Sequence, residues 1–261
     1  MKTAFPALSI ILIVLVAAIG GCGPGPAADR GNEVLTVAAA TDLQFAFTDI
    51  GRLFEEKTGA RVTFSFGSSG TLAQQIENGA PVDLFASADE EYVERLISRG
   101  SALPGSAAQY AVGRIALVTY RGSNLTLTRL YDLLRPEVRK VSIANPEHAP
   151  YGRAARQALT NAGLWEQVQP KLVYGENVRQ ALQFVETGNA EAGIVALSIA
   201  DVPRVSRVVV DDALYQPLNQ TMVIVKGAKQ ESLARDFIAF VNGPKGRPVM
   251  QRYGFLLPGE G

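Results

Sequence analysis

The sequence is poor in the side chains on which disulfide, zinc and nucleophilic chemistry depend. It contains one cysteine, Cys22, and one histidine, His148, among 261 residues. A single cysteine excludes an internal disulfide, and the two residues together are too few for a structural zinc cluster. A nucleophilic serine would have His148 as its only histidine base. The sequence therefore provides little for hydrolytic catalysis or for a structural zinc site.

An excess of charge of either sign is also missing. The chain has 25 basic and 25 acidic residues, so its formal net charge is zero. Proteins that bind nucleic acids usually carry a basic stripe that neutralises phosphates, and none stands out in this sequence. The charge balance therefore argues against a nucleic acid as the partner.

One long apolar run is present, and it lies at the N-terminus. Lys2 precedes the apolar residues Leu8–Ile19, and small residues follow, which is the plan of a signal peptide. The segment Ile19-Gly20-Gly21-Cys22 resembles a bacterial lipobox, which implies cleavage before Cys22 and attachment of lipid to its sulfur. An uncleaved membrane anchor is the alternative, although the run is shorter than the ~20 residues of a full span.

These features predict a signal peptide over residues 1–21, followed by a lipidated Cys22 and a flexible tether over residues 22–32. The rest of the chain is then expected on the periplasmic or cell-surface side of a bacterial membrane. In this interpretation the lipid anchor is the only attachment to the membrane.

Strands and helices are predicted to alternate along the rest of the chain. The first three strands, 34–40, 62–66 and 82–86, are each followed by a helix with an apolar face. This order favours a parallel sheet covered by helices, in which ligands bind at the carboxyl ends of the strands. A second unit of the same style is predicted from residue 141 onward.

We therefore predict an α/β protein of two similar lobes, with mixed or parallel sheets covered by helices and a ligand cleft between the lobes. Residues 33–112 together with 222–261 are assigned to the first lobe, and residues 113–221 to the second. The segment Tyr110–Tyr120 is longer than an ordinary strand, so it is a candidate for the crossing between lobes. The segment Thr221–Val225 is a candidate for the return crossing.

The segment Phe64–Ile76 contains the most distinctive turn from a strand into a helix. Gly67 and Gly70 permit backbone angles that bulkier residues resist. The helix that starts near Ser69 directs unpaired backbone N–H groups and hydroxyl groups toward one point, which suits an anion. No lysine, arginine or metal ligand lies in this segment. The pattern predicts a site in which neutral donors hold a small oxyanion.

Four such corners are expected around one cleft, two from each lobe. A helix N-terminus carries about half a positive charge and several unpaired N–H groups. Four of them around one cavity would bind a dianion without a countercharge. The corners are Thr41-Asp42, Ser68-Ser69, Tyr151-Gly152 and Asn177-Val178.

Longer motifs that include these corners cover nearly all of the chain beyond the tether. They are Val37-Ala-Ala-Ala-Thr-Asp-Leu43, Ser65-Phe-Gly-Ser-Ser-Gly-Thr-Leu-Ala73, Gly79-Ala-Pro-Val-Asp-Leu-Phe-Ala-Ser-Ala-Asp89, Asn145-Pro-Glu-His-Ala-Pro-Tyr-Gly152, Glu176-Asn-Val-Arg-Gln-Ala-Leu182, Gly193-Ile-Val195 and Arg252-Tyr-Gly-Phe255. On these motifs the chain resembles the substrate-binding proteins of bacterial molybdate ABC transporters, which are two-lobed type II periplasmic binding proteins.

The resemblance implies a set of oxyanion contacts. Thr41 and Ser69 take the positions of family hydroxyl groups, while Tyr151 and Val178 take positions that contact the ligand through backbone N–H groups. Asp42 stands where one branch of the family has asparagine. Because a carboxylate beside a dianion should repel it, we expect the Asp42 side chain to cap its own helix and only its backbone N–H to approach the ligand.

A second departure from the family pattern concerns a hydroxyl group. Ala196 stands where another branch of the family has a tyrosine that touches the ligand. Tyr151 or Ser198 could supply that hydroxyl from another corner. His148, in a proline-rich loop, is interpreted as a turn residue, and Asp83 and Asp89 are interpreted as capping or interlobe hydrogen-bonding residues.

The function implied by the resemblance is capture of molybdate, and also of tungstate, for delivery to an ABC permease and its ATPase. The protein would be a monomer with no cofactor, no catalytic residue and no direct metal ligand, since the metal arrives as an oxyanion. The alternative is a binding protein or sensor for sulfate, thiosulfate or phosphate. A serine hydrolase using Ser68 or Ser69 is disfavoured, because Gly67-Ser-Ser-Gly-Thr71 lacks the Gly-x-Ser-x-Gly elbow.

Overall fold

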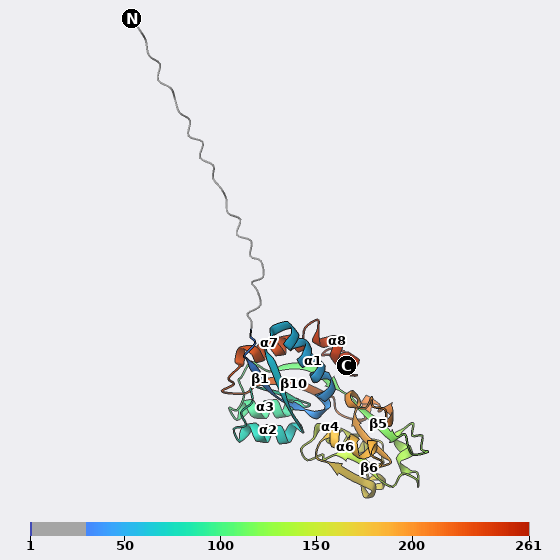
Figure 1. The fold of residues 1–261 in the computed structure, drawn as a ribbon. Coiled ribbons are helices and arrows are strands. Elements are labelled where there is room, and N and C mark those ends of the chain that lie inside the picture. Colours follow the sequence, from blue (N-terminus) through green and yellow to red (C-terminus); the bar gives the residue numbers. More distant parts are fainter. Residues whose placement is uncertain (2–29, 261) are drawn as a thin grey trace.

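The structure is a computed structural model that describes Met1 and residues 30–260. The predicted signal peptide, Cys22 and most of the predicted tether lie outside the described residues. Two five-stranded sheets form the centres of two lobes that lie side by side (Figure 1). The predicted fold class, two α/β lobes with helix-covered sheets, is confirmed.

The first lobe is built on a mixed sheet with the strand order β2-β1-β3-β10-β4. Strands β1, β2 and β3 run parallel, and β10 is antiparallel to both of its neighbours. The strands are β1 (Val34–Ala40), β2 (Arg61–Gly67), β3 (Leu84–Ser87), β4 (Ala108–Gly113) and β10 (Leu218–Ile224). The helices are α1 (Gln44–Thr58), α2 (Ser69–Glu77), α3 (Glu90–Ser98), α7 (Glu231–Val241) and α8 (Gly246–Arg252), with the 3₁₀ turn η1 (Thr41–Leu43).

The helices of the first lobe cover both faces of its sheet. Helices α1, α7 and α8 lie on one face, and α2 and α3 lie on the other (Figure 1). Phe47 and Phe54 of α1 pack edge-on against Phe237 of α7, with ring centroids 5.7 and 5.2 Å apart. Aromatic pairs in this geometry add stability beyond their buried area. This packing fixes α1, and with it the turn that leads from β1 into the cleft.

The second lobe has a mixed sheet with the order β7-β6-β8-β5-β9. Its strands are β5 (Ile115–Tyr120), β6 (Val141–Ala144), β7 (Leu172–Gly175), β8 (Ala192–Ala196) and β9 (Val205–Val209). Its helices are α4 (Pro150–Asn161), α5 (Trp165–Val168) and α6 (Val178–Glu186), with 3₁₀ turns η2 (Leu130–Leu134), η3 (Gln169–Lys171), η4 (Leu197–Ile199) and η5 (Asp212–Leu214). Strands β6 and β7 are parallel and lead directly into the corners before α4 and α6.

The chain crosses between the lobes at two places. Strand β4 belongs to the first sheet and β5 to the second, and only Arg114 separates them. The return crossing follows β9, after which β10 pairs with β3 and β4 of the first sheet. Two narrow crossings of this kind allow the lobes to move as rigid bodies about a hinge.

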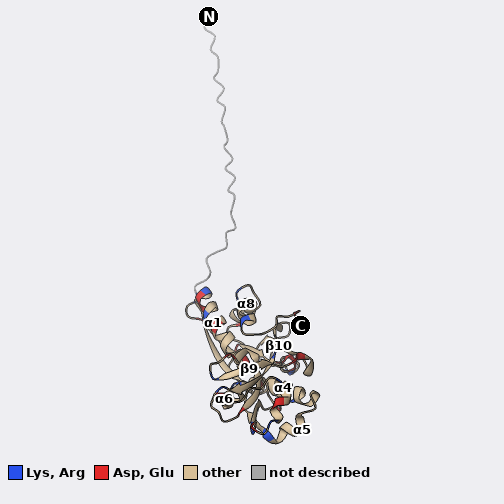
Figure 2. Cartoon of the chain, turned by 90° about the vertical axis from the view of Figure 1, so that its right-hand side faces the viewer, with Lys and Arg blue, Asp and Glu red and all other residues tan. Residues whose placement is uncertain are grey.

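Charged residues of both signs are distributed over the two lobes (Figure 2). The picture agrees with the balanced count of 25 basic and 25 acidic residues. Within residues 30–260, no helix has the length and apolar character needed to cross a membrane.

Candidate functional site

The four predicted corners meet at one cavity between the lobes. Its lining includes all five residues predicted to bind the ligand: Thr41, Asp42, Ser69, Tyr151 and Val178. Thr41, Asp42 and Ser69 follow strands of the first sheet, whereas Tyr151 and Val178 follow strands of the second. The parallel strands explain the convergence, because their carboxyl ends face the same edge of each sheet.

The corner before α2 leaves one backbone N–H group available. Ser68 is the N-cap, and its hydroxyl accepts a hydrogen bond from the amide of Thr71 at 3.4 Å. The amide of Gly70 donates to the carbonyl of His148 at 2.9 Å. The amide of Ser69 has no hydrogen-bond partner among the described residues, and Ser69 lines the cavity.

The corner before α6 is arranged in the same way. The side chain of Asn177 caps the helix by accepting from the amides of Arg179 and Gln180 at 3.1 and 3.0 Å. The first residue of the helix, Val178, is left with an amide that has no partner within residues 30–260. Valine has no polar side-chain atom, so this amide is the only donor that Val178 can offer.

The corner before α4 uses a proline to reach the same result. Pro150 occupies the first helical position, where its missing N–H costs nothing. The amides of Gly152 and Arg153 both donate to the carbonyl of Ala149, at 3.0 and 3.1 Å. The amide of Tyr151 remains without a partner in the described part of the chain. Three helices thus each present one unpaired amide at the cavity.

Two hydroxyl groups complete the set of neutral donors. The hydroxyl of Ser69 accepts from the amide of Ala88 at 3.0 Å, which leaves its own proton available to donate. The hydroxyl of Thr41 forms no hydrogen bond with the described residues, and Thr41 lines the cavity. Among the residues of this lining there is no lysine or arginine. The site therefore offers dipoles and hydrogen bonds, without a formal positive charge.

The expectation that Asp42 caps its own helix is wrong. The turn η1 has Ala40 as its N-cap, and neither η1 nor α1 has a side-chain cap. Instead, the Oδ2 atom of Asp42 accepts hydrogen bonds from the Tyr151 hydroxyl at 3.1 Å and from Nε2 of Gln220 at 2.7 Å. The carboxyl group thereby joins the two lobes at the base of the cleft.

Burial raises the pKa of Asp42 from 3.8 to about 6, although the hydrogen bonds from Gln220 and Tyr151 act in the opposite direction. The pKa of the Tyr151 hydroxyl is also raised, first by its burial and then by the charge of Asp42. Burial raises the free energy of the charged carboxylate relative to the protonated carboxyl group, and this is why the pKa rises.

Tyr151 and Ser198 were the two candidates to supply the hydroxyl group that Ala196 lacks. In the structure, the hydroxyl groups of both residues donate to Asp42. The Tyr151 hydroxyl donates to the side chain, and the Ser198 hydroxyl donates to the backbone carbonyl of Asp42 at 2.8 Å. Ser198 belongs to η4 of the second lobe, so this is a further bond between the lobes.

The two lobes are in direct contact beside the cavity. The Ser68 hydroxyl lies 2.9 Å from Nδ1 of His148, next to the backbone bond between Gly70 and His148. His148 is thus more than the turn residue that the sequence indicated, since its loop touches the opposite lobe. The sequence offered no sign of this pairing, because the two residues are 80 positions apart.

A second group of interlobe contacts centres on Arg153 of α4. Its guanidinium donates to the Tyr92 hydroxyl at 2.8 Å and pairs with the carboxylate of Asp89, both in the first lobe. Asp89 also caps α3 by accepting from the amide of Glu91 at 2.9 Å. The predicted capping and interlobe roles are both present at Asp89.

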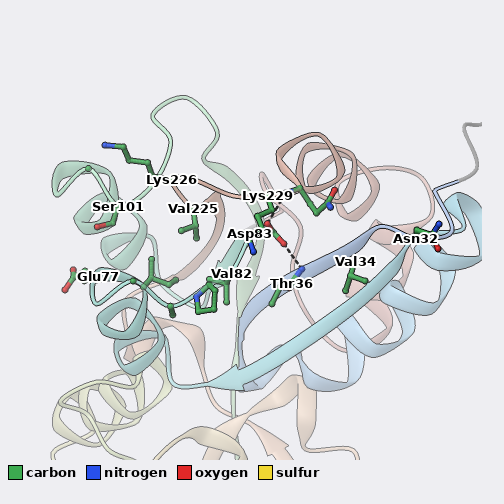
Figure 3. Close-up of a pocket in the computed structure, with 17 residues that line it drawn as sticks. Asn32, Val34, Thr36, Glu77, Val82, Asp83, Ser101, Val225, Lys226 and Lys229 are labelled. Carbon is green, nitrogen blue, oxygen red and sulfur yellow. Dashed lines mark hydrogen bonds between the residues drawn. The ribbon is translucent and has the colours of Figure 1, made fainter.

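A larger cavity, of about 590 Å³, lies in the first lobe away from the four corners (Figure 3). Asp83 lies in its wall, where its carboxylate accepts from the amides of Thr36 at 2.9 Å and Gln230 at 3.0 Å. Asp83 therefore holds β1 to the start of α7, within one lobe. Within residues 30–260, no group of three or more His, Cys, Asp and Glu side chains is placed to hold a metal ion.

Known proteins resemble this chain in sequence and in fold. The family of bacterial extracellular solute-binding proteins matches residues 35–256. The molybdate-binding protein ModA of Azotobacter vinelandii is 38% identical over 256 residues, covering 96% of this chain and 100% of that protein. The putative ABC transporter substrate-binding lipoprotein YvgL of Bacillus subtilis is 32% identical over 260 residues, covering 96% and 98% of the two chains. The solved structure of the Azotobacter vinelandii periplasmic molybdate-binding protein superimposes with a TM-score of 0.80 at 34% identity, covering 86% of this chain and 99% of that one.

Proposed function

Because this chain belongs to the family of bacterial extracellular solute-binding proteins, we propose that it captures molybdate in the interlobe cavity and delivers it to an ABC permease. The observation that carries the proposal is the set of unpaired amides at Ser69, Tyr151 and Val178, which come from both lobes and meet at one cavity. The choice of molybdate as the anion comes from the names of the relatives, which are molybdate-binding proteins.

Neutral donors of this kind are sufficient for tight binding of a dianion. A hydrogen bond to a charged group contributes about 1.5–3 kcal/mol net, and the amides lie at helix N-termini, where the dipole adds attraction. Sub-micromolar affinity requires about −8 kcal/mol. Three amides and two hydroxyls can reach that value after the cost of ordering the lobes is subtracted.

Fixed donors also select by size. Tungstate has nearly the dimensions of molybdate and is expected to bind as well. Sulfate has shorter bonds, so it would leave some donors unsatisfied, at a cost of about 1–3 kcal/mol for each buried group. Phosphate and thiosulfate remain the alternative ligands, and the carboxyl group of Asp42 keeps a protonated anion such as hydrogen phosphate among them.

Calorimetry of the anion-free protein against molybdate, tungstate and sulfate tests this function. The variants Thr41→Ala and Ser69→Ala should each bind molybdate about tenfold more weakly, because each loses one hydrogen bond to a charged ligand. Ser98→Ala, which removes an exposed hydroxyl bonded to the Arg95 carbonyl, is the control and should bind as the unaltered protein does. Unaltered affinity in both cavity variants would contradict the proposed site.

The protein would act as a lipid-anchored monomer outside the cytoplasm, and as a binding protein without catalytic activity. The lobes would close around the anion, and the permease and its ATPase would receive it from the closed form. The name of the Bacillus subtilis relative, a putative lipoprotein, supports the lipid anchor, as does the lipobox-like segment that ends at Cys22.

The anchor can be tested separately from the binding site. Cys22→Ser removes the sulfur that would carry the lipid, so this variant should leave the membrane fraction when cells are lysed and fractionated. Immunoblotting of the two fractions measures the change, and Ser98→Ala serves as the control that stays with the membrane. A Cys22→Ser protein that remains in the membrane fraction would rule out lipid attachment as the anchor.

A further inference from the structure

Asp42 is a buried carboxyl group in the wall of the anion cavity, and it has no positively charged partner among the described residues. Its exposed fraction is 1%. The titratable groups that face it are the hydroxyls of Tyr151 on α4 and Tyr110 on β4. The pKa of each of these hydroxyls is raised, first by burial, so both stay protonated at neutral pH.

The charged side chains on elements packed around Asp42 are engaged elsewhere. They include the ion pairs Arg153 with Asp89, Arg179 with Glu186, Arg114 with Asp212, Arg52 with Glu56, and Arg252 with Asp49. Lys57 of α1 lies over the Phe240 ring and Arg156 of α4 over the Trp165 ring. An anion bound beside Asp42 would therefore place its charge next to a second negative charge, with no nearby cation to offset either.

The hydrogen bonds around Asp42 show where a proton fits. Its Oδ2 atom accepts from Tyr151 and from Gln220, whereas its Oδ1 atom is buried and has no donor within the described residues. The Oε1 atom of Gln220 is likewise a buried acceptor without a donor. The cluster thus has two unsatisfied acceptors, and one additional proton on Oδ1 would turn one of them into a donor.

We propose that Asp42 makes anion binding depend on a proton: a fully ionised dianion binds together with one proton, which moves from solvent to the Oδ1 atom of Asp42. The inference rests on the proposed function and adds a specificity-determining residue to it. Uptake of the proton removes the repulsion between carboxylate and anion and supplies an O–H donor inside the site. An oxyanion that carries its own proton can share it with Asp42, and therefore needs none from solvent.

The pKa of Asp42 in the free and in the anion-bound protein sets the pH range in which proton uptake can be observed. Burial raises the pKa of Asp42 to about 6, so the group is mainly ionised in the free protein at pH 8. A bound dianion raises that pKa further, because it disfavours a second negative charge nearby. Between these two pKa values the affinity for a dianion falls as pH rises, by up to about tenfold per pH unit for one linked proton.

Molybdate titrations of the whole mature protein at pH 8, in buffers with different ionisation enthalpies, measure the protons taken up directly. We expect close to one proton per molybdate for the unaltered chain, and affinity that falls steadily from pH 6.5 to pH 8.5. Asp42→Asn keeps the shape and the acceptor oxygen but cannot take up a proton. It should show no uptake and a flat pH profile, with tighter binding than the unaltered chain at pH 8.5.

Ser69→Ala is the matched control in the same cavity. It should weaken binding at every pH while keeping the proton uptake and the slope of the unaltered protein. Molybdate binding by the unaltered chain with no proton uptake and a flat profile would overturn the role of Asp42 and leave the proposed function standing. This measurement does not depend on whether Asp42→Asn folds. If neither the unaltered protein nor Asp42→Asn binds molybdate at pH 6.5 or at pH 8.5, the proposed function is overturned, and this inference with it.

Discussion

Gly70→Ala is expected to bind molybdate about tenfold more weakly than the unaltered chain, although the residue has no side chain to contact the anion. A Cβ atom at Gly70 would lie 2.7 Å from the carbonyl oxygen of His148 and 2.9 Å from its Cβ atom. Both atoms belong to the opposite lobe, and the carbonyl oxygen is backbone that cannot rotate away. The added methyl group therefore obstructs closure at the point where the lobes touch.

The expected loss of affinity is estimated from the free-energy cost of overpacking, which is about 1–3 kcal/mol for an extra methylene-sized group. Each 1.4 kcal/mol corresponds to about a tenfold change in affinity. Within the first lobe the added Cβ atom would lie 2.9 Å from the Tyr92 hydroxyl, which is the far end of a side chain that can shift, and alanine favours a helix over glycine by about 1 kcal/mol. The loss should therefore appear in binding and closure, while the lobe stays folded.

Calorimetry measures the affinity, and small-angle X-ray scattering with and without molybdate measures how far the lobes close. Gln75→Ala is the control, since it alters an exposed side chain of the same helix α2. A Gly70→Ala protein that closes and binds as the Gln75→Ala protein does would show that this contact does not limit closure.

The corners of the cavity were predictable because their signals are local. Ser68 and Asn177 are good N-cap types at the starts of helices, and Pro150 fits a first helical position. Each corner is decided by residues within one turn of the chain. The alternation of strands and helices then places the corners at the same edges of the two sheets.

Asp42 shows what a local signal misses. Its side chain is a good N-cap type and follows a strand, so capping was the natural expectation. The partner that decides its position, Gln220, is 178 residues away in the sequence. The fold places the side-chain amide of Gln220 beside the carboxyl group of Asp42, and no local pattern in the sequence indicates that they are neighbours.

The interlobe contacts of Arg153 were missed for the same reason. An arginine just after a helix start resembles a solvated surface residue, whereas Arg153 reaches Asp89 and Tyr92 in the other lobe. The crossing between β4 and β5 was easier to predict, because an apolar segment longer than one strand is itself a local signal. The sequence thus indicated the two lobes and the corners that line the cavity, whereas the contacts that hold the lobes together required the structure.

Asp42→Asn is expected to raise the free energy of unfolding at pH 8 by about 3 kcal/mol. The pKa of Asp42 is 3.8 when unfolded and about 6 in the folded protein, where burial raises it. A difference of about two pKa units corresponds to about 3 kcal/mol at about 1.4 kcal/mol per unit. The raised pKa means that the folded state holds its proton more tightly than the unfolded state does.

Because the pKa of Asp42 is raised on folding, the stability of the folded protein falls as the pH rises. Below pH 3.8 both states are protonated and the carboxyl group imposes no penalty, so its full stabilising contribution is present there. As pH rises from about 4 to about 6, the unfolded state loses its proton first and the stability of the unaltered chain falls. Above pH 6 the loss is complete and constant. Asparagine, which does not titrate, should therefore gain over aspartate between pH 4 and pH 6 and keep that advantage at pH 8.

Urea unfolding of the ligand-free proteins at pH values from 4 to 8 measures this difference. Asp132→Asn is a control of opposite sign, because hydrogen bonds from the Thr128 and Arg129 backbone and from the Thr128 hydroxyl lower the pKa of Asp132 in the folded protein. That variant should be less stable than the unaltered chain by a nearly constant amount from pH 4 to pH 8, because the stabilisation by the ionised Asp132 is present above its unfolded pKa of 3.8 and is lost only as pH falls below that value. An Asp42→Asn advantage that is the same at pH 4 and pH 8 would show that packing of the amide, and not the titration of a buried carboxyl group, accounts for the difference.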